Sequence, residues 1–122
     1  MGSIPAFLLK KLYVKGSLKN TSNGFELTIQ NTLAPGTIVG LGPLQVDGVE
    51  YPLEQTRVIL SDGRSVSVAE ISAQEPMRFA VGDKVTIQVE GAPLAAGAHK
   101  VMISPKTKEA GVLEIPAEDT IL

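Results

Sequence analysis

Few side chains in this sequence could do chemistry near neutral pH. The 122 residues include no Cys and no Trp, and His99 is the single His. His99 stands two residues after Gly97, at the start of a predicted strand, where it could act as a general base or as a lone metal ligand. No carboxylate motif accompanies it, which favours a surface or rim position. We therefore expect no catalysis by the chain alone.

Two groups of acidic residues could bind a cation or hydrolyse a bond. One group surrounds a predicted turn: Asp47, Glu50 and Glu54. The other lies near the end of the sequence: Glu114, Glu118 and Asp119. The first group does not have the spacing of a calcium loop, and its Asp47 is explained by the turn with Gly48. We interpret the second group as solvated residues on a tail, and we predict no metal site and no cofactor.

The motifs for nucleophilic catalysis and nucleotide binding are incomplete. Neither Gly16-Ser17 nor Asp62-Gly63-Arg64-Ser65 has the G-x-S-x-G pattern of a nucleophile elbow. Gly40-Leu41-Gly42 lacks the further Gly and the helix that a dinucleotide fingerprint needs. We interpret these glycines as structural.

Arginine and tyrosine are the better candidates for a binding surface, because both residue types are enriched at protein interfaces. The interface or ligand candidates are Arg57, Arg64, Arg78, Tyr51, Tyr13 and His99. Phe25 and Phe79 could also anchor a partner, but a core position is favoured for both.

Charge and composition limit the classes of partner. Lys plus Arg is 11 and Asp plus Glu is 13, so the net charge is −2, and the basic residues are scattered. That pattern argues against nucleic-acid binding. The apolar run at residues 4–9 is too short to cross a membrane or form a secretory signal. The absence of Cys suits a reducing compartment, so we expect a cytoplasmic protein.

Apolar and polar residues alternate along most of the sequence, as in half-buried β-strands. The alternation is clearest in Phe25, Leu27 and Ile29, directly after an Asn23-Gly24 turn. Turns of the hairpin type occur again at Asp47-Gly48 and at Ser61-Asp62-Gly63. Strands are predicted at residues 12–18, 25–30, 37–39, 44–46, 49–51, 57–60, 64–66, 84–90, 100–104 and 112–115.

One short helical turn interrupts the strands. Ser67 and Glu70 have the spacing of a capping box, and Val66 and Ile71 are placed as its hydrophobic staple, which predicts a helical turn near residues 67–74. The fold class is therefore all-β: a single two-layer antiparallel β-sandwich, immunoglobulin-like, over residues 1–122. Residues 1–11 form an N-terminal segment, and residues 105–122 a loop, a short strand and a tail.

A surplus of apolar surface is expected, because 43% of the residues are hydrophobic in a domain too small to bury them all. Long strand edges combined with apolar surface favour burial against a protein partner or a second copy. The loops at residues 33–43 and 105–111 are the longest and could be functional surfaces.

A series of turn and strand signals runs over most of the sequence, from about Gly24 to Ser104. These signals are Gly24-Phe25-Glu26-Leu27, residues 46–52, Asp62-Gly63-Arg64 with Glu70-Ile71, residues 79–85 and residues 94–101. Together they resemble the small β-subunit of C-glycoside deglycosidases. The resemblance implies a non-catalytic subunit that binds a larger metal-dependent barrel subunit and helps to close its site, with residues 33–43 as the candidate loop.

Short chains of this kind are also similar to proteins labelled hydroxymethylglutaryl-CoA reductase. The sequence has no nucleotide loop, no catalytic Lys-Asp-His set and too few residues for that activity.

Three hypotheses from different classes stay open. The first is a non-catalytic accessory or interaction subunit of a heteromeric enzyme. The second is a self-associating structural β-sandwich that forms a homo-oligomer. The third is a small-ligand-binding protein or stand-alone enzyme with a concave pocket that contains His99 or an Arg.

Overall fold

Two long strands form the middle of the first layer of the structure. In the computed structural model, which describes residues 4–122, β2 (Gly24–Gln30) and β9 (Lys84–Glu90) pair antiparallel along their whole lengths. Phe25, Leu27 and Ile87 on these strands are almost completely buried, since every second side chain faces the other layer. The alternation in the sequence therefore predicted the two central strands correctly.

The first layer contains five strands. Its order is β1 (Lys19–Thr21), β2, β9, β6 (Thr56–Ile59) and β7 (Ser65–Ser67), and all neighbours are antiparallel. β1 and β7 are the edge strands of this layer.

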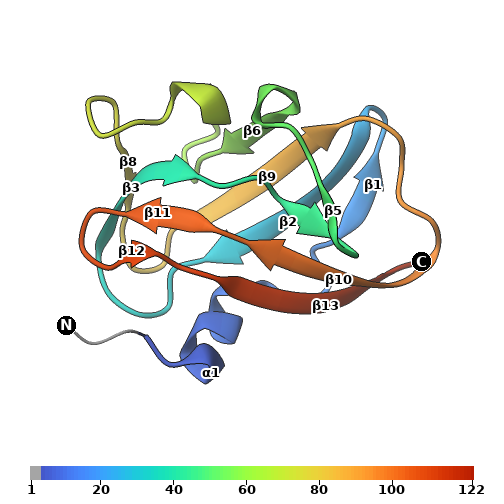
Figure 1. The fold of residues 1–122 in the computed structure, drawn as a ribbon, viewed down its shortest axis with the longest axis horizontal. Coiled ribbons are helices and arrows are strands. Elements are labelled where there is room, and N and C mark those ends of the chain that lie inside the picture. Colours follow the sequence, from blue (N-terminus) through green and yellow to red (C-terminus); the bar gives the residue numbers. More distant parts are fainter. Residues whose placement is uncertain (1–3) are drawn as a thin grey trace.

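The second layer consists of two four-stranded sheets that lie side by side (Figure 1). One has the order β13 (Ile115–Ile121), β10 (Gly97–Ile103), β4 (Gln45–Val46) and β5 (Val49–Glu50). The other has the order β12 (Gly111–Val112), β11 (Pro105–Thr107), β3 (Gly36–Leu41) and β8 (Met77–Phe79). One residue separates β10 from β11, so the chain passes directly from the first of these two sheets into the second.

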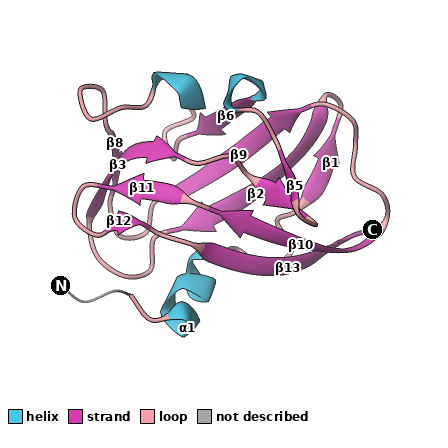
Figure 2. Cartoon of the chain, viewed as in Figure 1, coloured by secondary structure: helices cyan, strands magenta, loops and turns pink. Residues whose placement is uncertain are grey.

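The helical elements are short and lie outside the two layers (Figure 2). They are the α-helix α1 (Ala6–Leu9) and the 3₁₀ turns η1 (Lys10–Leu12), η2 (Leu53–Gln55) and η3 (Val68–Glu70). Within residues 4–122, no helix is long and apolar enough to cross a membrane. The prediction of an all-β, two-layer sandwich is confirmed.

The strand predicted at residues 12–18 is wrong. Leu12 ends a 3₁₀ turn, and Tyr13 forms only an isolated bridge with Ile29. Gly16 has a φ of +85°, and the amide of Ser17 donates to the carbonyl of Val14, so the backbone turns there instead of extending. The N-terminal segment predicted at residues 1–11 contains α1, which the sequence pattern did not indicate, and residues 1–3 lie outside the described part.

The segments predicted as long loops hold more strand than expected. The region of residues 33–43 contains the six-residue β3, because the small Gly40 fits in the strand opposite Lys106. Residues 105–111 include β11 and the start of β12. The predicted tail is the seven-residue β13, and Pro116 is tolerated there because β13 is an edge strand.

The helical turn predicted near residues 67–74 is a single 3₁₀ turn, η3. The side chain of Ser67 forms no cap hydrogen bond, so the capping box is not made. The turn at Asp47-Gly48 is confirmed: both residues have positive φ, +53° and +83°, as a tight hairpin between β4 and β5 requires.

Gly24 provides a direct test of the packing between β2 and β9. A Cβ atom at Gly24 would overlap the carbonyl oxygen of Val89, which is part of the backbone and cannot rotate away. We expect Gly24→Ala to lower the free energy of unfolding by more than about 3 kcal/mol. Gly40→Ala is the matched control, because its Cβ would meet nothing closer than 3.8 Å. Urea unfolding measures both, and equal effects of the two variants would contradict this packing.

Candidate functional site

Asp119 is the most heavily bonded carboxylate among the described residues. Its Oδ2 atom accepts the hydroxyl of Tyr13 at 2.6 Å and the backbone amides of Gly16 and Leu18 at 2.8 and 3.3 Å. The residue is only 6% exposed. The interpretation of Asp119 as a solvated tail residue is therefore wrong: it is a buried acceptor that holds the segment of residues 13–18 against β13.

The register of β13 explains why Asp119 faces inwards. Ile115, Ala117, Asp119 and Ile121 alternate along the strand, and all four are buried or half-buried on its inner side. This period-two pattern was present in the sequence. The acidic residues around it obscured it.

Burial alone would raise the pKa of the Asp119 carboxyl group. The hydroxyl of Tyr13 and the amides of Thr120, Leu18 and Gly16 outweigh that effect and hold the pKa below its usual range. Burial, and then the bond to Asp119, raise the pKa of Tyr13 far above its usual value. Both groups therefore keep a fixed protonation state near neutral pH, which suits a structural role.

His99 is fastened at both ring nitrogens. Nδ1 lies 2.6 Å from Oδ2 of Asp47, and Nε2 lies 2.7 Å from the carbonyl oxygen of Ala95. Both partners can only accept hydrogen bonds, so both nitrogens must donate, and the ring is then the charged imidazolium. The bond to Ala95, followed by the bond to Asp47, raises the pKa of His99.

Asp47 joins the β4–β5 turn to two neighbouring residues of β10, His99 and Lys100. Its other oxygen, Oδ1, accepts the amide of Lys100 at 2.9 Å. This backbone bond, and then the bond from His99, lower the pKa of Asp47. His99 and Asp47 thus tie the β4–β5 turn to the segment that leads into β10. Neither ring nitrogen is left to act as a base or as a metal ligand.

Arg64 and Arg78 line one cleft, although 14 positions separate them in the sequence. The cleft has a volume of about 840 Å³ and lies between the edge strands β7 and β8. Arg64 pairs with Asp62 at 2.8 Å, and both side chains of this pair are mostly exposed. Apolar atoms of Leu60, Val66 and Met77 line the same cleft.

The other two candidates lie elsewhere. Arg57 stands on the outer side of β6 and donates to the hydroxyl of Ser65 at 3.2 Å. Tyr51 packs edge-on against Phe25, with ring centroids 5.1 Å apart. The structure therefore brings together two of the six candidates, Arg64 and Arg78.

A second hollow lies on the outer side of β10 and β13. It has a volume of about 540 Å³, and Lys10, Lys15 and Lys100 line it together with Met102 and Pro116. Tyr13 is the one candidate residue in its wall, and its hydroxyl is already bonded to Asp119. No lysine in this hollow was selected from the sequence, because the three come from separate segments.

The acidic residues around the β4–β5 turn do not converge. Glu50 accepts the side-chain amide of Gln45, and Glu54 lies on the 3₁₀ turn η2. Within residues 4–122, no three His, Asp or Glu side chains form a group that could hold a metal ion.

Comparison with known protein families identifies the family to which this chain belongs. Residues 8–122 match the family described as "Hydroxymethylglutaryl-CoA reductase, N-terminal domain", so the match covers both layers of the sandwich. The chain belongs to this family, whose description names one domain of a larger enzyme. No curated protein matches the chain.

The family match corrects the resemblance to the small β-subunit of C-glycoside deglycosidases, which is wrong. The segments that suggested it were turns and alternating strands. These signals recur in β-sandwiches of any family, because they report hairpins and a buried sheet face and not a binding site.

The buried carboxylate predicts a graded loss of stability. We expect Asp119→Ala to lower the free energy of unfolding by about 3 kcal/mol, because it leaves the Tyr13 hydroxyl and the amides of Gly16 and Leu18 without their acceptor. Tyr13→Phe removes one donor and keeps the ring, so a loss of about 1 kcal/mol is expected. Urea unfolding of both variants gives the comparison. A smaller loss in Asp119→Ala than in Tyr13→Phe would contradict the role of Asp119 as the shared acceptor of these three donors.

The pKa of His99 predicts a pH dependence of stability. Because the folded state raises this pKa above 6.5, the stabilisation is complete below about pH 6.5 and is lost as the pH rises through the folded value. The lowered pKa of Asp47 affects stability in the acidic range, where stability is lost as the pH falls through the pKa of Asp47 in the folded state. The urea concentration at the unfolding midpoint should be measured between pH 5 and 9. In the protein without substitutions it should decrease as the pH becomes alkaline, and in His99→Gln it should change less. Parallel profiles for the two proteins would exclude the imidazolium bridge.

Proposed function

We propose that this chain is a non-catalytic interaction domain that binds a larger protein through the cleft between β7 and β8. The cleft itself carries the proposal, because it places two arginines and apolar side chains beside two strand edges. The family description supports the same role, since it names a domain of a larger enzyme.

The two edge strands offer backbone groups to a partner. β7 is paired only with β6, and β8 only with β3, among the strands of the described residues. An edge strand keeps a row of amides and carbonyls without a sheet partner, and such edges are used to dock other chains.

The side chains of the cleft match the composition of protein interfaces. Arg78 is exposed and forms no ion pair within residues 4–122, while Arg64 pairs only with the exposed Asp62. An exposed pair of this kind contributes little to folding, so its arginine is available to a carboxylate of the partner. Glu70 and Glu75 line the same cleft. They would repel a partner whose acidic residues lay beside them and not beside the arginines.

Self-association is the second candidate function. Val49 on the end strand β5 and Val112 on the end strand β12 are 56% and 60% exposed. Apolar side chains on end strands favour edge-to-edge pairing of two copies.

Size-exclusion chromatography with light scattering separates the two candidates. The chain would be measured alone and after mixing with the remaining part of the larger enzyme that the family description names. We expect a shift to a larger complex. A tight homo-oligomer that ignores the larger protein would contradict the proposal and support self-association.

Charge reversal locates the interface. Arg64→Glu and Arg78→Glu should each weaken the complex by about tenfold or more, as loss of an arginine contact does at an interface. Arg57→Glu is the matched control, because Arg57 lies on the outer side of β6 and does not line the cleft. Weakening by Arg57→Glu alone would place the interface on the other sheet face.

A further inference from the structure

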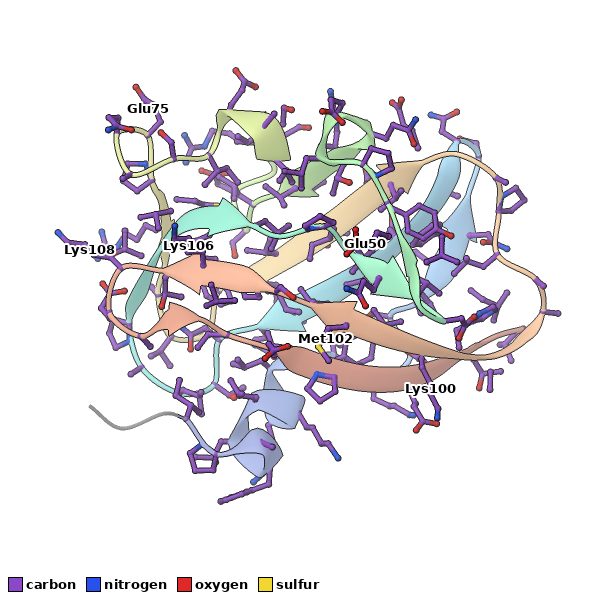
Figure 3. The ribbon with its side chains drawn as sticks, viewed as in Figure 1. Glu50, Glu75, Lys100, Met102, Lys106 and Lys108 are labelled. Carbon is purple, nitrogen blue, oxygen red and sulfur yellow. The ribbon has the colours of Figure 1, made fainter. Side chains whose placement is uncertain are left out.

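The hollow on the outer side of β10 and β13 shares no lining residue with the β7/β8 cleft. Its floor is a sheet face, where Met102 on β10 stands opposite Pro116 on β13. Met102 and Lys100 lie on the side of the sandwich that faces the viewer in Figure 3, on the same strand. We call this hollow the lysine groove.

Two segments form the walls of the lysine groove. The segment from Lys10 to Lys15 lies along β13, and Gln45 and Gly48 of the β4–β5 hairpin lie beyond β10. The first wall is held in place by the bond from Tyr13 to Asp119 and by the bond from the ammonium group of Lys15 to the carbonyl oxygen of Glu118, 2.8 Å long. A ligand would therefore meet a wall that is already ordered, which lowers the entropy cost of binding.

The charge of the lysine groove is opposite to that of the whole chain. Three lysines line it against one acidic residue, Glu118, although the net charge of the chain is −2. Glu118 lies opposite Lys100 in the pairing of β10 with β13, yet no ion pair within 4.0 Å forms between a carboxylate and any of the three lysines in residues 4–122. The ammonium groups of Lys10 and Lys100 are thus available to an anion, and that of Lys15 keeps N–H donors beyond its bond to the carbonyl oxygen of Glu118.

The floor between these charges is apolar. Met102, Pro116 and Ala117 line it, and all three are only half-buried in the described chain. Binding sites for small molecules have volumes of about 300–1,000 Å³ and combine an apolar lining with a few polar groups. At about 540 Å³, the lysine groove falls within that range.

We infer that the lysine groove binds a small organic anion, with its acidic group at the lysines and a short apolar body on Met102 and Pro116. A carboxylate and a phosphate monoester share the chemistry that the groove recognises. The ligand site does not depend on the interaction at the β7/β8 cleft, so either can fail without the other.

The test uses the full chain and a fluorescent probe with the same two features. 8-Anilinonaphthalene-1-sulfonate has a sulfonate and an apolar ring system, and N-phenyl-1-naphthylamine has nearly the same rings without the charge. We expect saturable binding of the anionic probe at one site per chain, weakened by added salt, and much weaker binding of the neutral probe.

Charge reversal at the lysines then locates the site. Lys10→Glu and Lys100→Glu should each weaken binding of the anionic probe by about tenfold, because a like charge at the site repels the ligand. Lys106→Glu and Lys108→Glu are the matched controls, since both residues lie outside the groove and are labelled in Figure 3. Equal weakening by all four variants, or no saturable binding, would overturn the inference.

Competition identifies the acidic group. Octanoate and octyl phosphate should both displace the probe, and the stronger competitor indicates which acidic group the lysines prefer. Acetate, inorganic phosphate and octanol each lack one half of the ligand and should displace it poorly. Displacement by inorganic phosphate as strong as that by octyl phosphate would contradict the role of the apolar floor.

Discussion

The carboxylate of Asp119 joins the two ends of the chain, and the edge of the second layer depends on it. One oxygen accepts three donors from residues 13–18, which are more than 100 positions away in the sequence. Without these bonds, the described residues would keep one polar contact between the N-terminal segment and β13, the bond from the ammonium group of Lys15 to the carbonyl oxygen of Glu118. The long edge of β13 would then be more open to other chains. A buried carboxylate is costly unless it is fully bonded, so the position tolerates little change.

The same contact builds the lysine groove. Because Tyr13 is fixed by Asp119, the residues on either side of it, Lys10 and Lys15, are held along β13. The hairpin on the opposite side is fixed by Asp47, which bonds both His99 and the amide of Lys100. Two carboxylates that sequence patterns indicate only as tail and turn residues thus position both walls of one hollow.

Sequence patterns predicted the parts of the fold that local chemistry determines. The alternation in β2 and β9 and the positive-φ turn at Asp47-Gly48 are local signals, and both are confirmed. The predictions for the N-terminal segment and for β13 were wrong because the two depend on contacts with each other. The register of β13 turns Asp119 inwards, and residues 13–18 supply the donors that its buried carboxylate needs. In the same way, His99 and Asp47 are 52 positions apart, and only the sheet topology brings them together.

The use of the polar groups supports the proposal that this chain has a binding role. Shifted pKa values often mark reactive groups, because catalysis needs a proton acceptor or donor that is free to react. Here Asp119, Tyr13 and His99 have shifted pKa values, and each of these groups is already bonded to other parts of the described chain. Their shifts therefore report how firmly they hold the fold. Cationic side chains stay available at the β7/β8 cleft and at the lysine groove, the two sites of the proposals. Cations of this kind recognise an acidic partner or ligand without reacting with it.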